Sequence, residues 1–141
     1  MSTYSPLSTD LAAQIADQLT YTGDGLIPAI AQQVDAQGHE GEVLMMAWMN
    51  RDAVIETLTT GRACYFSRSR SKLWRKGESS GQMQTLIDFR WDCDQDTVLM
   101  LVDQKGVACH TGRRNCFYNA VRDGKVQSIA EVEIDPGDLY G

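Results

Sequence analysis

Three of the four cysteines fall in one stretch, Trp91–Tyr118, with a spacing that suits a metal-dependent active site. Cys93, Cys109 and Cys116 are too far apart for a redox C-x-x-C pair, and a structural zinc site usually has four protein ligands. Three thiolates leave one coordination position for water, as catalytic zinc requires. The alternative is that these reduced cysteines are only small buried hydrophobic residues.

The aspartates around Cys93 form a second set of candidate ligands. On an extended backbone, Asp92, Asp94 and Asp96 would point to one face and Cys93 to the other. Soft sulfur and hard oxygen ligands would then be separated, which favours two different metals. A solvated turn is the alternative. An EF-hand calcium loop is disfavoured because Thr97 stands at that loop's glycine position and an unbroken apolar strand follows.

His110 directly follows the second of these cysteines. An imidazole titrates near neutral pH and can therefore carry protons during a reaction. A lone histidine is more often structural. Its position between the candidate ligands Cys109 and Cys116 makes His110 a candidate general acid or base.

The segment Ser67–Gly81 (SRSRSKLWRKGESSG) is basic and rich in serine. Its cations and hydroxyls can bind phosphate, its glycines let backbone amides approach an anion, and its tryptophan can stack on a base or ribose. The alternative is a flexible, solvated or phosphorylatable loop. In an acidic chain, such a concentration of basic residues favours a substrate-binding segment. The candidates are Ser67, Arg68, Ser69, Arg70, Trp74, Lys76, Gly77 and Ser79, with further charge from Lys72 and Arg75.

The length and charge of the chain restrict its class. Its 141 residues fit one domain that buries roughly two thirds of its unfolded surface without disulfides. A formal charge of -6 and a pI near 4.8 argue against a general nucleic-acid binder. The sequence shows neither a leader pattern nor an apolar run of membrane-spanning length. We expect a cytoplasmic protein with reduced cysteines and no nucleic-acid or membrane partner.

The hydrophobic pattern predicts several strands and two short helices. Asp10–Leu19 is expected to be a helix whose apolar stripe is Leu11, Ile15 and Leu19. Asn50 is expected to cap a second helix that Gly61 ends in the left-handed conformation. The expected strands are Leu26–Val34, Val43–Met49, Cys64–Phe66, Gln82–Trp91, Val98–Val102 and Cys116–Val121. Pro136 and Gly137 argue against a terminal helix.

Four segments in this order make the sequence resemble the phosphoribosyl-AMP cyclohydrolase family of histidine biosynthesis. They are GEVLMMAWMN (Gly41–Asn50), FSRSRSKLWRKGESSGQ (Phe66–Gln82), DCDQD (Asp92–Asp96) and ACHTGRRNCFY (Ala108–Tyr118). The resemblance extends from about Leu26 to Val121. Gln95, Ser79 and Asn115 replace the glycine, threonine and serine that the family usually has, and none of them is a candidate ligand.

The resemblance implies hydrolysis of phosphoribosyl-AMP between N1 and C6 of the adenine ring. It also implies zinc bound by Cys93, Cys109 and Cys116, and magnesium bound by Asp92, Asp94 and Asp96. Family members are homodimers that share zinc ligands between chains and have a β-rich α+β fold. We therefore expect an α+β fold with few short helices, a β-rich mixed sheet or pseudobarrel, and an intertwined homodimer. The substrate would be a small nucleotide.

The same resemblance divides the chain into three parts. They are an N-terminal helical appendage (residues 1–25), a cyclohydrolase domain (26–125) and an acidic C-terminal tail (126–141). Two other interpretations stay open on the residues alone. One is a structural, zinc-bridged dimerisation module, and the other is an RNA-binding protein that uses the basic segment.

Overall fold

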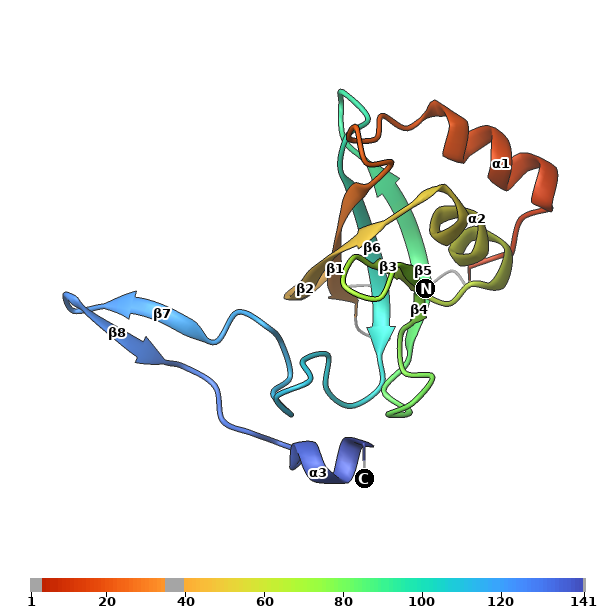
Figure 1. Cartoon of the computed structure of the whole chain (residues 1–141). Helices are drawn as coiled ribbons and strands as arrows, with labels where there is room; N and C mark the ends of the chain where they lie inside the picture. The colour runs from red at the N-terminus through yellow and green to blue at the C-terminus, as the bar shows by residue number, and fades with distance from the viewer. Residues whose placement is uncertain (1–3, 35–39, 141) are drawn as a thin grey trace.

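The computed structural model describes residues 4–34 and 40–140 and shows an α+β fold (Figure 1). The α+β class with few short helices is therefore confirmed. The helices are α1 (Thr9–Gln18), α2 (Arg51–Thr60) and α3 (Pro136–Tyr140). The strands are β1 (Ile27–Val34), β2 (Glu40–Met49), β3 (Cys64–Ser67), β4 (Lys72–Arg75), β5 (Gln84–Trp91), β6 (Val98–Gln104), β7 (Asn119–Arg122) and β8 (Lys125–Ser128).

A four-stranded sheet with the order β2-β1-β6-β5 forms the centre of the molecule. β1 runs parallel to β6, whereas β1–β2 and β5–β6 are antiparallel pairs. Burial alternates along the first part of β1, so that Ile27 and Ala29 face the core. In β6, Met100, Leu101 and Val102 are all buried, as expected of an inner strand that is covered on both faces.

Helices α1 and α2 lie together on one side of the sheet (Figure 1). At the start of each helix, a side chain accepts a hydrogen bond from a backbone amide that would otherwise be unpaired. The Ser8 hydroxyl accepts from Leu11 N–H at 3.2 Å, and Asn50 Oδ1 accepts from Ala53 N–H at 2.8 Å. Gly61 ends α2 with a φ of 75°, which confirms the predicted left-handed cap.

The buried face of α1 includes Leu19 and the half-buried Ile15 of the predicted stripe, but not Leu11. Ala12 and Ala16 are fully buried, while Leu11 is 45% exposed. The small alanines allow α1 to approach α2 closely, and together with Leu19 they join the same hydrophobic core as the sheet. The stripe prediction selected the largest apolar residues, but close helix contact selects small ones.

Two hairpins leave the sheet. β3 and β4 pair antiparallel, so the basic segment Ser67–Gly81 contains a strand. β7 and β8 form a two-stranded arm that extends away from the body of the molecule (Figure 1). The predicted strand over Cys116–Val121 is wrong in its first part, because β7 begins only at Asn119 and Cys116 lies in the preceding loop.

The prediction that Pro136 and Gly137 prevent a terminal helix is also wrong. Proline needs no amide partner in the first turn, so it suits the start of α3. Asp135 Oδ1 accepts from Gly137 N–H at 2.8 Å, and the Asp135 carbonyl accepts from Asp138 N–H at 2.8 Å. Leu139 anchors the short helix, since it is only 6% exposed.

The strands within residues 4–34 and 40–140 form one open sheet and two separate ribbons, with no closed barrel. The pseudobarrel and the intertwined homodimer therefore stay predictions. Over the same described ranges, no helix is both long and apolar enough to span a membrane.

Candidate active site

A cavity of about 670 Å³ opens beside the β3–β4 hairpin and brings the basic segment together with His110. The exposed His110 side chain comes from the loop that follows β6. Cations, hydroxyls and an aromatic ring therefore surround one space that also holds a candidate proton carrier. The lining residues are Ser67, Ser69, Arg70, Lys72, Leu73, Trp74, Lys76, Gly77, Glu78, Ser79, Ser80 and His110.

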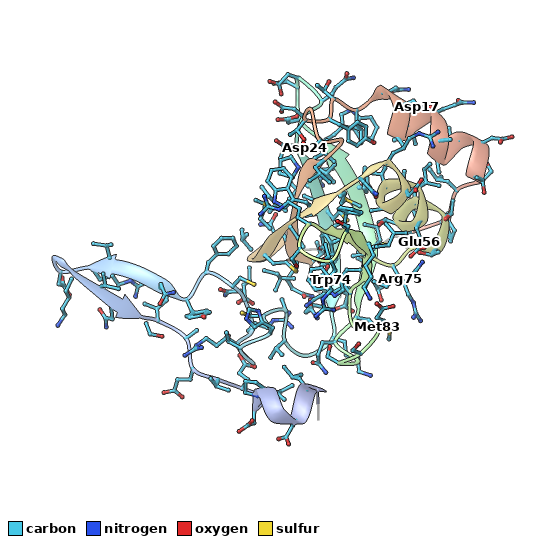
Figure 2. All side chains as sticks on the ribbon, viewed as in Figure 1. Asp17, Asp24, Glu56, Trp74, Arg75 and Met83 are labelled. Atoms are coloured by element: carbon cyan, nitrogen blue, oxygen red, sulfur yellow. The ribbon has the colours of Figure 1, made fainter. Side chains whose placement is uncertain are left out.

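The register of the hairpin decides which side chains reach this cavity. Trp74 and Arg75 are neighbours in β4, so they point to opposite faces of the strand. Trp74 lines the cavity, with its ring centroid 5.4 Å from that of buried Tyr65. Arg75 instead forms an ion pair with Glu56 of α2, with Nε 2.7 Å from Oε2 (Figure 2). This pair fixes β4 against α2 and leaves Trp74 facing the cavity.

Arg68 is the one predicted substrate-binding residue that does not line the cavity. Its guanidinium lies over the ring of Trp48 on β2, 5.1 Å from the ring centroid. Such a cation–π contact contributes about 0.5–1 kcal/mol at an exposed site, which favours this position of the side chain. The structure therefore separates Arg68 from Arg70, although only one residue stands between them.

Gly77 is required where the hairpin ends. Its φ is +85°, and a Cβ there would lie 2.6 Å from the Met83 backbone nitrogen. The chain then folds back on itself, with Gly81 N–H donating to the Gly77 carbonyl at 2.8 Å. This compact turn places Ser79 and Ser80 along the cavity.

Cys109 and Cys116 are brought together by a closed loop after β6, which we call the cysteine loop (residues 106–118). Within it, Cys109 N–H donates to the Arg113 carbonyl at 3.1 Å, and Gly112 N–H donates to the Cys109 carbonyl at 3.0 Å. Cys116 N–H donates to Leu44 of β2 at 2.8 Å, which ties the loop to the sheet.

The two thiols of this loop have different acidities. Burial alone would raise the pKa of Cys109, but hydrogen bonds from Thr111, whose hydroxyl lies 3.1 Å from the sulfur, bring it below the usual value. Loss of water around the Cys116 sulfur, followed by the charge of Cys109, raises the pKa of Cys116 to about 12. A pair of neighbouring sulfurs that resists double ionisation is suited to a cation that takes the place of the protons.

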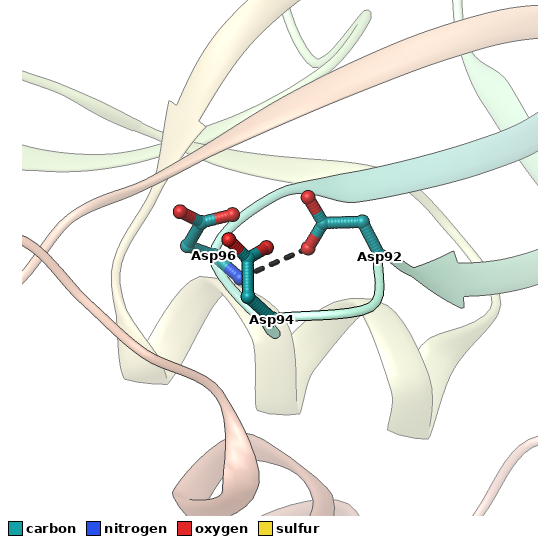
Figure 3. A group of neighbouring side chains, drawn as sticks. All are labelled: Asp92, Asp94 and Asp96. Carbon is teal, nitrogen blue, oxygen red and sulfur yellow. Dashed lines mark hydrogen bonds between the residues drawn. The ribbon is translucent and has the colours of Figure 1, made fainter.

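The three predicted aspartate ligands also come together, but not in the predicted way. Their carboxylate oxygens lie within 4.8 Å of one another (Figure 3). The backbone is a turn and not an extended strand: Gln95 has a φ of 66°, and Asp92 N–H donates to the Thr97 carbonyl at 3.1 Å. The prediction that alternation would place the three aspartates on one face is therefore wrong, since the turn gathers them.

Backbone amides organise this aspartate turn (residues 92–97). Asp92 Oδ1 accepts from the N–H groups of Asp96 at 3.0 Å and Thr97 at 3.2 Å. These bonds outweigh desolvation and lower the pKa of Asp92, whereas contact with Asp94 raises the pKa of Asp96. Crowded carboxylates of this kind are the oxygen ligands that magnesium and calcium prefer.

Cys93 lies far from the other two candidate zinc ligands. It is exposed in the aspartate turn at the start of β6, while the cysteine loop follows the end of β6 (Figure 1). In the part of the chain that the structure describes, the aspartates are the only three potential ligands whose donor atoms all lie within 4.8 Å of one another. One chain therefore offers two sulfurs at one end of β6 and the third at the other.

The chain is similar along most of its length to proteins of known name. A family model described as phosphoribosyl-AMP cyclohydrolase matches residues 45–118. A protein named phosphoribosyl-AMP cyclohydrolase from Magnetococcus marinus is 63% identical, over 87% of this chain and 92% of its own. The chain belongs to the phosphoribosyl-AMP cyclohydrolase family. Proteins of the same name from Granulibacter bethesdensis and Gluconobacter oxydans are 61% and 55% identical, over 92% and 99% of this chain and 98% and 86% of their own.

The match to the cyclohydrolase family covers the segments that hold every candidate site residue, from β2 to the end of the cysteine loop. It confirms the predicted resemblance and the prediction of an enzyme, a hydrolase of histidine biosynthesis. The comparisons thus favour the enzyme over a structural zinc-bridged module or an RNA-binding protein.

Sequence reasoning missed the side chains that hold the cysteine loop of this cyclohydrolase-family chain in place. The Arg114 guanidinium donates to the Gly106 carbonyl at 2.5 Å and to Gln33 Oε1 at 2.6 Å, and it pairs with Glu42 at 3.2 Å. The position of Arg114 between the candidate ligands Cys109 and Cys116 was a sequence signal for a structural role. Nothing local indicated its partners on β1 and β2, which are 81 and 72 residues away in sequence.

Proposed function

We propose that this chain hydrolyses the adenine ring of 1-(5-phosphoribosyl)-AMP between N1 and C6 in the cytoplasm, giving the formimino carboxamide ribonucleotide. The observation that carries this proposal is the 63% identity, over most of both chains, with a protein named phosphoribosyl-AMP cyclohydrolase. The cavity supports it, because it combines phosphate-binding groups, an aromatic ring and a histidine in one place.

The cavity suits a nucleotide that carries two phosphate groups. Arg70 and Lys72 are exposed cations in its wall and can form charge-assisted hydrogen bonds with phosphate oxygens. The serine hydroxyls and the backbone around Gly77 add neutral donors. Trp74 presents a ring on which the base or ribose can stack. We therefore assign substrate binding to this wall of the cavity.

His110 is our candidate for the proton transfers. Ribosylation at N1 makes C6 an electrophilic, amidinium-like carbon that water can attack. The water oxygen bonds to C6 as one water proton is removed, and the C6–N1 bond breaks as N1 takes up a proton. The remaining water proton leaves the oxygen, which becomes the carboxamide carbonyl. An imidazole that is exposed in the cavity wall can accept the first water proton and donate the proton to N1 near neutral pH.

Zinc is the metal that we propose for the cysteines. Cys109 and Cys116 supply two neighbouring sulfurs, and Cys93 supplies the third. Zinc with three protein ligands can activate water for hydrolysis at neutral pH. For the aspartate turn we propose magnesium, because Asp92, Asp94 and Asp96 offer only hard oxygen ligands. Magnesium there would help to orient a substrate phosphate.

We further propose that each zinc site is shared by two chains of a homodimer. Cys93 of the partner subunit would complete the pair Cys109 and Cys116, since the chain's own Cys93 lies at the opposite end of β6. The arrangement is reciprocal in a two-fold dimer, so each chain contributes to both sites.

Exposed apolar side chains support the presence of a second copy. On β2, Val43 and Met46 are 43% and 45% exposed, and in the cysteine loop Phe117 is 52% exposed. On the β7–β8 arm, Val121 and Val126 are each 78% exposed. A two-stranded ribbon is marginally stable by itself, and clustered apolar exposure is typical of interaction surfaces. A second copy of the chain would cover the exposed apolar side chains of β2 and the cysteine loop and those of the β7–β8 arm.

An assay of ring opening with purified, zinc-replete protein tests the proposed function. Phosphoribosyl-AMP should be converted with a change in ultraviolet absorbance, while AMP, which lacks the N1 ribosyl group, should be inert. Cys109→Ser should lose zinc and activity, and the buried Cys64→Ser is the matched control that should keep its zinc. Absence of turnover by the wild-type protein would refute the proposal, and zinc loss from Cys64→Ser would refute the ligand assignment.

A further inference from the structure

Lys76 differs from the other cations of the cavity because it is buried. It is 8% exposed, whereas Arg70 and Lys72 in the same wall are exposed. Its backbone is fixed as well, since Lys76 N–H donates to the Ala63 carbonyl at 3.1 Å. A lysine that serves as a flexible phosphate ligand would keep its ammonium group in the open cavity, and Lys76 does not.

The Lys76 ammonium is directed at the cysteine loop. Its Nζ donates to the Ala108 carbonyl at 2.5 Å and lies 5.3 Å from the centroid of the Trp74 ring. Ala108 immediately precedes Cys109, and its own N–H donates to the Arg114 carbonyl at 2.9 Å. The peptide groups on both sides of Ala108 are therefore held by hydrogen bonds, one of them from Lys76.

A buried ammonium needs a negative partner. No carboxylate among the described residues forms an ion pair with Lys76. Burial lowers the pKa of Lys76, and the nearby thiols of Cys116 and Cys109, which can carry negative charge, partly oppose that shift. Three thiolates around one zinc ion leave a net charge of about -1, which one ammonium offsets.

We propose that Lys76 is a positioning residue for the zinc site, and not a phosphate ligand. Its ammonium fixes the peptide that precedes Cys109 and offsets the negative charge of Cys109 and Cys116. It thereby links the hairpin that lines the substrate cavity to the loop that holds the metal. This inference rests on the zinc site of the proposed function.

Zinc affinity of the metal-free protein, measured by competition with a chromogenic chelator, tests the inference without any turnover. Lys76→Met should raise the zinc Kd by roughly 10- to 100-fold, the usual effect of removing a group that supports metal ligands. Lys76→Arg retains the charge and should recover most of the affinity. Lys72→Met, an exposed lysine of the same cavity, is the matched control and should change the zinc Kd less than about twofold.

The outcomes separate this inference from the proposed function. Wild-type protein that binds no zinc would overturn the zinc site itself. Wild-type affinity in Lys76→Met, together with a raised KM, would make Lys76 a phosphate ligand and overturn the inference alone. Thermal unfolding checks that each variant folds. Should Lys76→Met not fold, Lys76→Gln takes its place, and equal loss of affinity in Lys76→Gln and Lys76→Arg would exclude the charge as the cause.

Discussion

Mixing two inactive variants tests whether each active site is built from two chains. Cys93→Ser removes the ligand in the aspartate turn, and Cys109→Ser removes one in the cysteine loop. β6 has seven residues, so at about 3.3 Å per residue it separates these positions by roughly 20 Å. Two sulfurs bound to one zinc ion lie only about 4 Å apart. The chain's own Cys93 and Cys109 therefore cannot share a metal ion without refolding of the sheet.

The expected recovery follows from the two-fold symmetry. After co-refolding of equal amounts, half of the dimers contain one chain of each kind. In a mixed dimer, one site receives both lesions and the other receives neither. One intact site in half of the dimers corresponds to roughly a quarter of wild-type activity. The zinc content should rise in the same proportion.

The assay compares each variant refolded alone with the refolded mixture, using ring opening of phosphoribosyl-AMP and bound zinc as readouts. Different affinity tags on the two chains allow the mixed dimers to be isolated before the measurement. Each variant alone should be inactive. Isolated mixed dimers that stay inactive and zinc-poor would refute the shared site.

Three further predictions concern the cavity wall and the hairpin. Arg70→Ala should raise KM roughly tenfold, because it removes a charged donor from the cavity, whereas Arg68→Ala should change KM less than about twofold. Gly77→Ala should lower the free energy of unfolding by roughly 2–4 kcal/mol in urea titrations. Gly81→Ala, with a similar φ of +77° and open space around it, should cost only about 1 kcal/mol. In Glu56→Gln, the free energy of unfolding should fall less steeply on acidification than in the wild type, because the hydrogen bond from Arg75 holds the pKa of Glu56 below its usual value.

Each of these predictions has a result that contradicts it. Equal KM values for the two arginine variants would show that Arg70 does not bind substrate. Equal losses of unfolding free energy in the two glycine variants would show that the close contact with Met83 does not destabilise Gly77→Ala. For Glu56 the sign follows from the lowered pKa: the ion pair stabilises the fold above the unfolded pKa and is lost as the pH falls through the folded one. Unfolding curves with identical acid limbs would contradict that assignment.

Local signals in the sequence were sufficient for much of the fold. The caps at Asn50 and Gly61 depend on side chains and backbone angles within a few residues, and the helix between them was predicted correctly. The unbroken apolar run in β6 identified an inner strand. By contrast, the terminal helix was missed because Asp135 acts as its cap and Pro136 suits its first turn, a context that overrides the usual effect of proline.

The types of the candidate ligands could be read from the sequence, but their arrangement could not. The carboxylates of Asp92, Asp94 and Asp96 converge because Gln95 adopts a left-handed backbone conformation. The alternating pattern of an extended strand does not predict such a conformation. The different positions of Arg68 and Arg70 depend on an aromatic ring of another strand. The burial of Lys76 depends on contacts with the cysteine loop, which only the folded chain creates.

If two chains share each site, the length of β6 would make the activity depend on the concentration of the chain. With the shared site that we propose, a newly made chain carries halves of two sites and no complete one, because the strand keeps the halves at opposite ends. While dimers are scarce, turnover should rise with the square of the chain concentration, and it should become proportional to it once most chains are paired. A cell that makes few copies would then obtain almost no product from each, so synthesis of the chain would set a threshold for flux through this step.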